Sequence, residues 1–137
     1  MHTTDIHGAL FSHDFIENGP ARGALSRVYA FVCREREKHP NTSVLLDCGD
    51  VLQGQPTAYY YNFVDTRSPH LIAEVMNHMK YDALCIGNHD LEMGHAVYDR
   101  FVAQCHFPVL AANLVSEQTG KPYFSPYTVG SRYRGFL

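Results

Sequence analysis

Apolar runs typical of buried β-strands alternate along this sequence with longer runs that have helical periodicity. Helices are expected at 23–38, 71–79 and 97–105, where apolar residues recur every three or four positions. Strands are expected at 44–48, 83–86 and 109–112. Strands and helices that alternate at this spacing favour right-handed βαβ units. We therefore expect an α/β fold in which helices pack on a mainly parallel sheet.

Three short polar segments follow stretches that can form strands. They are Asp5-Ile6-His7, Gly49-Asp50 and Gly87-Asn88-His89-Asp90. In a parallel α/β sheet, ligands bind outside the carboxyl ends of the strands, so these segments are expected to meet. Their carboxylate, imidazole and amide groups suit divalent cations such as Mn²⁺, Fe²⁺ and Zn²⁺. Two such ions roughly 3.5–4 Å apart can stabilise the attacking and leaving oxygens when a phosphate ester is hydrolysed.

Each segment also has an ordinary structural interpretation when it is considered alone. Asp5 and His7 would project from one side of an extended strand end and hold one cation, but a loop aspartate and a surface histidine also fit. Asp50 could bridge two metals, or it could form an Asx-turn or a helix N-cap. Asn88 could bind the second metal while His89 contacts the phosphate or protonates its leaving group, although the same tetrapeptide could form a turn. The three segments in this order favour the metal site.

The charge balance restricts the ligands that the chain is expected to bind. A net charge of −3 over 137 residues gives no basic surface for nucleic acid or an anionic membrane. Cations must then supply the positive charge for any phosphate. No apolar run reaches the ~18 residues of a membrane-spanning helix, and no charged and then apolar leader opens the chain.

The cysteines and the remaining histidines are expected to be structural. The four cysteines have no C-x-x-C pair, so free thiols are expected, with Cys48 and Cys85 buried in strands; a disulfide framework is the alternative. Asp47 is expected in a hydrogen-bond network or at a sheet edge. Six histidines are expected to be exposed or to cap helices, although His95 is close enough in sequence to be a second partner of His89: His13, His39, His70, His78, His95 and His106.

The aromatic cluster at 59–63 could stack on a nucleobase, but packing of a helix or loop onto the sheet is the more common role of such a cluster. The sequence contains no P-loop, G-x-G-x-x-G or G-x-S-x-G segment. This excludes nucleoside-triphosphate, dinucleotide and serine-hydrolase sites of those types.

The segments TTDIHG (3–8), DCGDVLQG (47–54) and GNHDLE (87–92) resemble, in content and order, the amino-terminal half of the calcineurin-like metallophosphatase domain. More narrowly, the chain resembles the 5′-nucleotidase and 2′,3′-cyclic-nucleotide 2′-phosphodiesterase family over most of its length. The resemblance implies that His89 is the catalytic histidine and that Glu92 orients it. Asp5 and His7 would hold one metal, Asp50 would bridge and Asn88 would hold the other, so the implied metal ligands are Asp5, His7, Asp50 and Asn88.

The resemblance also implies two divalent metals of the Mn, Zn or Fe type in the intact enzyme, a nucleotide or other phosphoester substrate, and a location in the periplasm or at the cell surface. The family completes its metal pair with a later histidine and a Gly-His-x-His segment, and no histidine follows Asn113 here. A carboxy-terminal nucleoside-binding domain is also missing from the sequence. Residues 1–137 are therefore expected to be an incomplete catalytic domain, truncated at both ends, that binds fewer metals.

Two alternatives remain open at this stage. The chain could belong to a metallophosphoesterase with another substrate, such as a nuclease or a protein phosphatase. It could also be a non-catalytic fragment or a metal-binding module. A separate expectation concerns the start of the chain. Met1 lies so close to Asp5 that we expect no room for a strand before the segment Asp5-Ile6-His7.

Overall fold

The computed structural model describes residues 1–130 and contains a four-stranded parallel sheet. Its strands are β1 (His2–Thr3), β4 (Leu46–Asp47), β5 (Ala83–Cys85) and β6 (Val109–Leu110). They pair in the order β1-β4-β5-β6, and Thr3 lies opposite Asp47, which lies opposite Leu84. The carboxyl ends of the strands that precede the three polar segments are therefore neighbours in the sheet.

Helices connect successive strands, as the periodicity predicted. The three connecting helices are α1 (Leu25–Lys38), α3 (Leu71–His78) and α5 (His95–Gln104). Shorter elements surround the carboxyl edge: the hairpin of β2 (His13–Asp14) and β3 (Gly19–Pro20), α2 (Pro56–Tyr59), the π-helix η1 (Tyr60–Val64) and α4 (Asn88–Glu92). No helix within the described part of the chain is long and apolar enough to cross a membrane.

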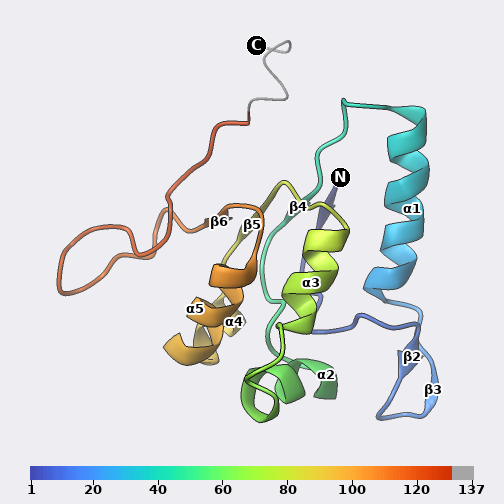
Figure 1. Ribbon diagram of the computed structural model, residues 1–137, viewed down its shortest axis with the longest axis horizontal. Helices are drawn as coiled ribbons and strands as arrows, with labels where there is room; N and C mark the ends of the chain where they lie inside the picture. Colours follow the sequence, from blue (N-terminus) through green and yellow to red (C-terminus); the bar gives the residue numbers. More distant parts are fainter. Residues whose placement is uncertain (131–137) are drawn as a thin grey trace.

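The strand order explains which face of the sheet is covered. Each crossover steps in the same direction across the sheet, and right-handed crossovers that do so place their helices on one face. Figure 1 shows α1, α3 and α5 side by side on one face of the sheet. Apolar side chains fill the layer between the helices and the sheet, among them Ile72, Met76, Leu84 and Phe101, all of which are fully buried.

Two local expectations about the strands are wrong. Cys48 and Cys85 are exposed, because strand residues alternate between the covered and the uncovered face; all four cysteines are free thiols. The chain also has room for a strand before Asp5. His2–Thr3 forms β1, and it is held by bonds from Leu46 N–H to the Met1 carbonyl (3.1 Å) and from the Met1 ammonium to the Val44 carbonyl (2.8 Å).

The aromatic cluster does not pack onto the sheet as a unit. Its residues form the end of α2 and the π-helix η1, in which Tyr59, Tyr60 and Phe63 are 46–61% exposed while Asn62 is buried. One of the histidines expected at the surface, His70, is fully buried against this segment. The other five are exposed, as predicted.

Candidate metal centre

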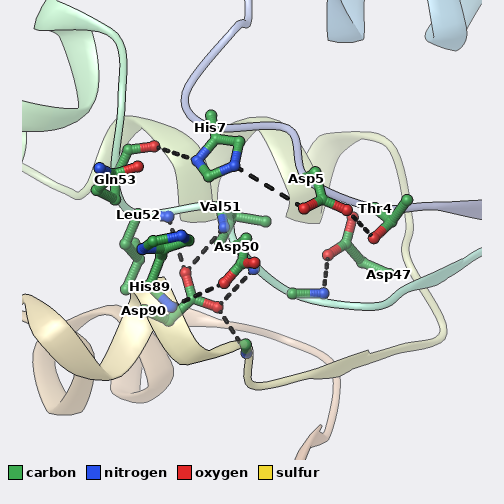
Figure 2. Close-up of polar contacts among 12 residues, drawn as sticks. Thr4, Asp5, His7, Asp47, Asp50, Val51, Leu52, Gln53, His89 and Asp90 are labelled. Carbon is green, nitrogen blue, oxygen red and sulfur yellow. Dashed lines mark hydrogen bonds and ion pairs between the residues drawn. The ribbon is translucent and has the colours of Figure 1, made fainter.

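The side chains of Asp5, His7 and Asp50 converge at the carboxyl edge of the sheet. One potential ligand atom from each residue lies within 4.8 Å of the others, and His7 Nε2 is 3.9 Å from Asp5 Oδ1. Figure 2 shows the three side chains on the loops that follow β1 and β4. Two carboxylates and one imidazole are a donor set that suits a divalent cation such as Mn²⁺, Fe²⁺ or Zn²⁺.

The backbone brings these residues together by an unexpected route. The parallel pairing of β1 with β4 continues into the loops, where Asp5 N–H donates to the Gly49 carbonyl (3.0 Å) and His7 N–H donates to the Asp50 carbonyl (2.9 Å). The backbone is not extended, because Asp5, His7 and Asp50 have φ angles of 53°, 48° and 60°. The prediction that Asp5 and His7 project from one side of an extended strand end is therefore wrong about the backbone. Left-handed backbone at a non-glycine residue is strained, and such residues cluster at active sites and ligand clamps.

Two glycines allow the loops after β4 and β5 to approach each other. A Cβ atom on Gly49, whose φ is +97°, would overlap the backbone of Gly87. A Cβ atom on Gly87 would overlap the Asp50 carboxylate. Only residues without a side chain fit where the two loops cross. Gly49 and Gly87 therefore position Asp50, the third potential ligand.

The ring of His7 has a defined orientation. Its Nδ1–H donates to the Gln53 carbonyl at 3.0 Å, and Nε2 faces Asp5. A hydrogen bond from one ring nitrogen to a backbone carbonyl selects the tautomer in which the other nitrogen is free to bind a metal. The His7 side chain is 35% exposed, so a cation can reach it from solvent.

Asp90 is the main residue of this site that the sequence interpretation missed. It is fully buried, and its carboxylate accepts four backbone hydrogen bonds: Oδ1 from Val51 (2.8 Å) and Leu52 (2.9 Å), Oδ2 from Asp50 (2.9 Å) and Gly87 (2.9 Å). Burial raises the pKa of Asp90, and the four amides oppose that shift. An acidic residue three positions after a helix N-cap predicts only the bond to Gly87; the other three depend on the tertiary fold.

Asp47 lies beneath the site and belongs to a hydrogen-bond network, as predicted. It is 2% exposed and accepts hydrogen bonds from Thr3 Oγ1 (2.5 Å) and Gly49 N–H (2.8 Å), and the Tyr81 hydroxyl lies 2.8 Å from the same threonine oxygen. Burial raises the pKa of Asp47 to about 6. Its oxygens are occupied by these donors, so its visible role is to support the loop that follows β4.

His89 and Glu92 are in contact on α4. The His89 Nδ1–H donates to Glu92 Oε2 at 2.8 Å, and the His89 backbone N–H donates to Asp50 Oδ1 at 2.9 Å. The rings of His7 and His89 are 5.5 Å apart between centroids. Glu92 raises the pKa of His89, chiefly through this hydrogen bond. The pair therefore has the geometry expected of an acid that orients an imidazole, while its catalytic role stays a prediction.

Two other predicted residues have less defined positions. Asn88 is exposed at the first position of α4, directly after Gly87, so its backbone lies beside the converging ligands. Its role as a metal ligand stays a prediction. His95, considered as a partner of His89, lies at the start of α5, and within the described chain its Nδ1 is 2.6 Å from the Tyr98 hydroxyl and 3.1 Å from the Tyr123 hydroxyl.

Comparison with known proteins gives a consistent result. The sequence profile described as Calcineurin-like phosphoesterase matches residues 1–133. The chain is 32% identical to the Trifunctional nucleotide phosphoesterase protein YfkN of Bacillus subtilis, over 95% of this chain and 9% of that protein. It is 31% identical to a 2′,3′-cyclic-nucleotide 2′-phosphodiesterase/3′-nucleotidase of Yersinia enterocolitica, over 94% of this chain and 20% of that protein.

A solved structure agrees with these sequence matches. The crystal structure of the calcineurin-like phosphoesterase YfkN from Bacillus subtilis superposes with a TM-score of 0.84 at 29% identity, over 94% of this chain and 40% of that one. The chain therefore corresponds to one part of considerably longer proteins.

Proposed function

Because the chain belongs to the calcineurin-like phosphoesterase family, we propose that it forms part of a metal-dependent hydrolase of nucleotide phosphoesters. The reaction would be of the 5′-nucleotidase or 2′,3′-cyclic-nucleotide phosphodiesterase type. The first type rests on the resemblance of the sequence motifs, and the second also appears in the name of the Yersinia enterocolitica relative. The main structural support is the approach of Asp5, His7 and Asp50 to within 4.8 Å of one another beside His89. Calcineurin-like phosphoesterases bind divalent metals, and this donor set suits them.

The proposed ligands divide between two ions. Asp5 and the free Nε2 of His7 would hold one, Asn88 would hold the other, and the Asp50 carboxylate would bridge them. Asp50 fits this role because its Oδ1 is fixed by the His89 amide. When bound, divalent ions of the Mn, Zn or Fe type neutralise phosphate charge and lower the pKa of a nearby water.

His89 would act on the substrate itself. Its Nδ1–H is held by Glu92, so the opposite nitrogen has a defined direction. Glu92 also raises the pKa of His89, which favours the protonated imidazolium. A protonated ring beside the ligand cluster can donate a hydrogen bond to a phosphoryl oxygen and then a proton to the leaving oxygen. Glu92 would stabilise the charge on the ring during both steps.

We further propose that residues 1–137 supply only part of the catalytic domain, because the two relatives are much longer than this chain. An exported protein of the periplasm or cell surface would be consistent with the family resemblance. The first statement bears on the chemistry, because an incomplete catalytic domain is expected to bind fewer metals than the intact enzyme.

Metal content and turnover test the proposal together. The purified chain would be loaded with Mn²⁺, its bound metal counted by elemental analysis, and its activity measured on bis-p-nitrophenyl phosphate and on 2′,3′-cyclic AMP. Bound metal together with turnover that is lost in Asp50→Asn supports the hydrolase. Asp99→Asn is the control, because Asp99 is an exposed acid that bonds Tyr123. Metal without turnover would show that the ligand cluster binds a cation and that residues 1–137 alone do not catalyse, as an incomplete domain predicts. The absence of both metal and turnover would refute the proposal.

A further inference from the structure

The π-helix η1 buries a polar side chain and exposes the apolar ones around it. Asn62 is 3% exposed, whereas Tyr60 and Phe63 are 47% and 46% exposed. The turn is widened by the bond from Asp65 N–H to the Tyr60 carbonyl (2.9 Å), five residues apart. Single π-helical turns are rare in proteins, and those that occur are often found at functional sites. A buried amide is costly unless it is hydrogen-bonded, so the partners of Asn62 are informative.

Both ends of the Asn62 amide are bonded. Nδ2 donates to the Leu52 carbonyl at 2.6 Å, and Oδ1 lies 2.9 Å from Nε2 of His70. The Leu52 carbonyl can only accept, so the amide nitrogen must face it, and His70 must then carry its hydrogen on Nε2. His70 is fully buried and is packed against the ring of Phe101 at 5.5 Å between centroids. His70 therefore fixes the direction in which Asn62 points.

The Leu52 carbonyl belongs to the loop that supplies the ligands. The N–H groups of Asp50, Val51 and Leu52 all donate to Asp90. The Gln53 carbonyl accepts from Nδ1 of His7, and the Asp50 carbonyl accepts from the backbone of the same histidine. Figure 2 shows this loop between His7 and Asp90. Asn62 supplies the bond to the carbonyl between these two acceptors.

We propose that Asn62, oriented by His70, is a positioning residue for the metal centre: it fixes the Leu52 carbonyl and, through this loop, the Asp50 carboxylate and the Gln53 carbonyl that orients His7. The inference rests on the proposed function, because the loop matters to a metal only if these residues bind one. Without the amide, the buried Leu52 carbonyl loses its donor, and the penalty for an unsatisfied acceptor favours movement of the loop toward another donor. Removal of a group bonded directly to a metal ligand typically weakens metal binding about 10–100-fold, and Asn62 acts one step farther out, so we expect a loss at the lower end of this range.

Asn77 provides a matched control within the same chain. Its Nδ2 donates to the Gln104 carbonyl at 2.8 Å and its Oδ1 accepts from His106 N–H at 2.7 Å. Like Asn62, it joins two segments through both ends of its amide, but these segments are α3 and the end of α5 with the turn that follows it. Asn77→Leu should lower stability without changing the ligand loop.

The first measurement is the Mn²⁺ dissociation constant of the 137-residue chain, determined by electron paramagnetic resonance. Asn62→Leu is expected to raise this constant about tenfold. His70→Leu should act in the same direction, and His70→Gln, whose amide can donate in place of Nε2, should restore most of the affinity. Asn77→Leu should leave the constant within about twofold of wild type while lowering the unfolding midpoint. If Asn62→Leu does not fold, the comparison of His70→Leu with His70→Gln tests the proposal instead.

The second measurement needs no metal. In the wild type, ¹⁵N NMR should show the Nδ1–H tautomer of neutral His7 and slow exchange of the Leu52 amide. Asn62→Leu should mix the tautomers and accelerate that exchange, whereas Asn77→Leu should change neither. If the wild type binds no Mn²⁺ but Asn62→Leu still shows these NMR changes, the proposed function is refuted and the loop positioning stands. If Asn62→Leu matches Asn77→Leu in affinity, tautomer and exchange, the inference is overturned.

Discussion

The buried carboxylate of Asp90 accepts a 2.9 Å hydrogen bond from the backbone of Asp50, so an acid that does not contact solvent positions an acid that faces the ligand cluster. The same carboxylate binds the Gly87 amide, which belongs to the segment after the next strand. One side chain therefore joins two of the three polar segments. We therefore expect the geometry of the site to depend on this junction.

Replacement of Asp90 by asparagine should disrupt the junction. The amide nitrogen of asparagine would face two backbone N–H groups and leave them buried without acceptors, which costs roughly 1–3 kcal/mol for each. We expect the free energy of unfolding of Asp90→Asn to fall by about 3 kcal/mol in urea titrations, with loss of Mn²⁺ binding. Asp99→Asn is the control, because its side chain is 47% exposed on the following helix, outside the ligand cluster. A change in stability below about 0.5 kcal/mol would contradict this role.

Replacement of Gly87 by alanine should displace a ligand. The new Cβ would overlap the Asp50 carboxylate, so either the loop or the side chain has to move. We expect Mn²⁺ affinity to fall at least about tenfold, since the ligand no longer faces the cluster. Gly23→Ala should change neither affinity nor the unfolding midpoint, because its Cβ would meet nothing within 4 Å. Equal affinities for the two variants would show that the close approach of the loops is unimportant.

The buried His70 predicts a loss of stability in acid. Burial lowers the pKa of His70 to about 4 from 6.5, so the unfolded chain binds a proton that the folded chain excludes. This contribution is complete above pH 6.5 and is lost as the pH falls from 6.5 to about 4, by up to about 3 kcal/mol. Urea unfolding of wild type and His70→Gln at pH 7.5 and pH 4.5 measures the difference. A parallel pH dependence of the two proteins would refute the prediction.

Asp47 predicts the opposite dependence. Burial raises the pKa of Asp47 to about 6, so its contribution is present below the unfolded value of 3.8 and is lost as the pH rises through 6. Relative to Asp47→Asn, the metal-free wild type should become less stable between pH 4 and pH 7.5, by up to about 3 kcal/mol. The comparison requires a chelator throughout. A constant difference between the two proteins across this range would exclude the shifted pKa.

Local patterns were sufficient to predict most of the fold. The helices α1, α3 and α5 were predicted from the spacing of their apolar residues. The expected run begins two residues before the observed start of α1 and ends one residue after the observed end of α3. The α/β class and the meeting of the polar segments followed from alternation and from the position of strand ends. Asp5, His7 and Asp50 were identified because each follows a strand.

Other features depend on tertiary contacts that no local pattern encodes. The left-handed backbone of Asp5 and His7 reflects pairing with the loop after β4, which cannot be inferred from D-x-H. Cys85 is exposed because strand order determines the covered face. His70 is buried because Asn62 in a π-helix offers its ring a partner, and a histidine before a helix normally suggests a cap.

The most direct measurement is an anomalous-difference map from a crystal of this chain soaked in Mn²⁺ and recorded at the manganese absorption edge. The account predicts a peak about 2–2.3 Å from Nε2 of His7 and from carboxylate oxygens of Asp5 and Asp50, typical of first-row divalent metal sites. A peak bound only elsewhere, or none at a Mn²⁺ concentration that supports turnover, would contradict it.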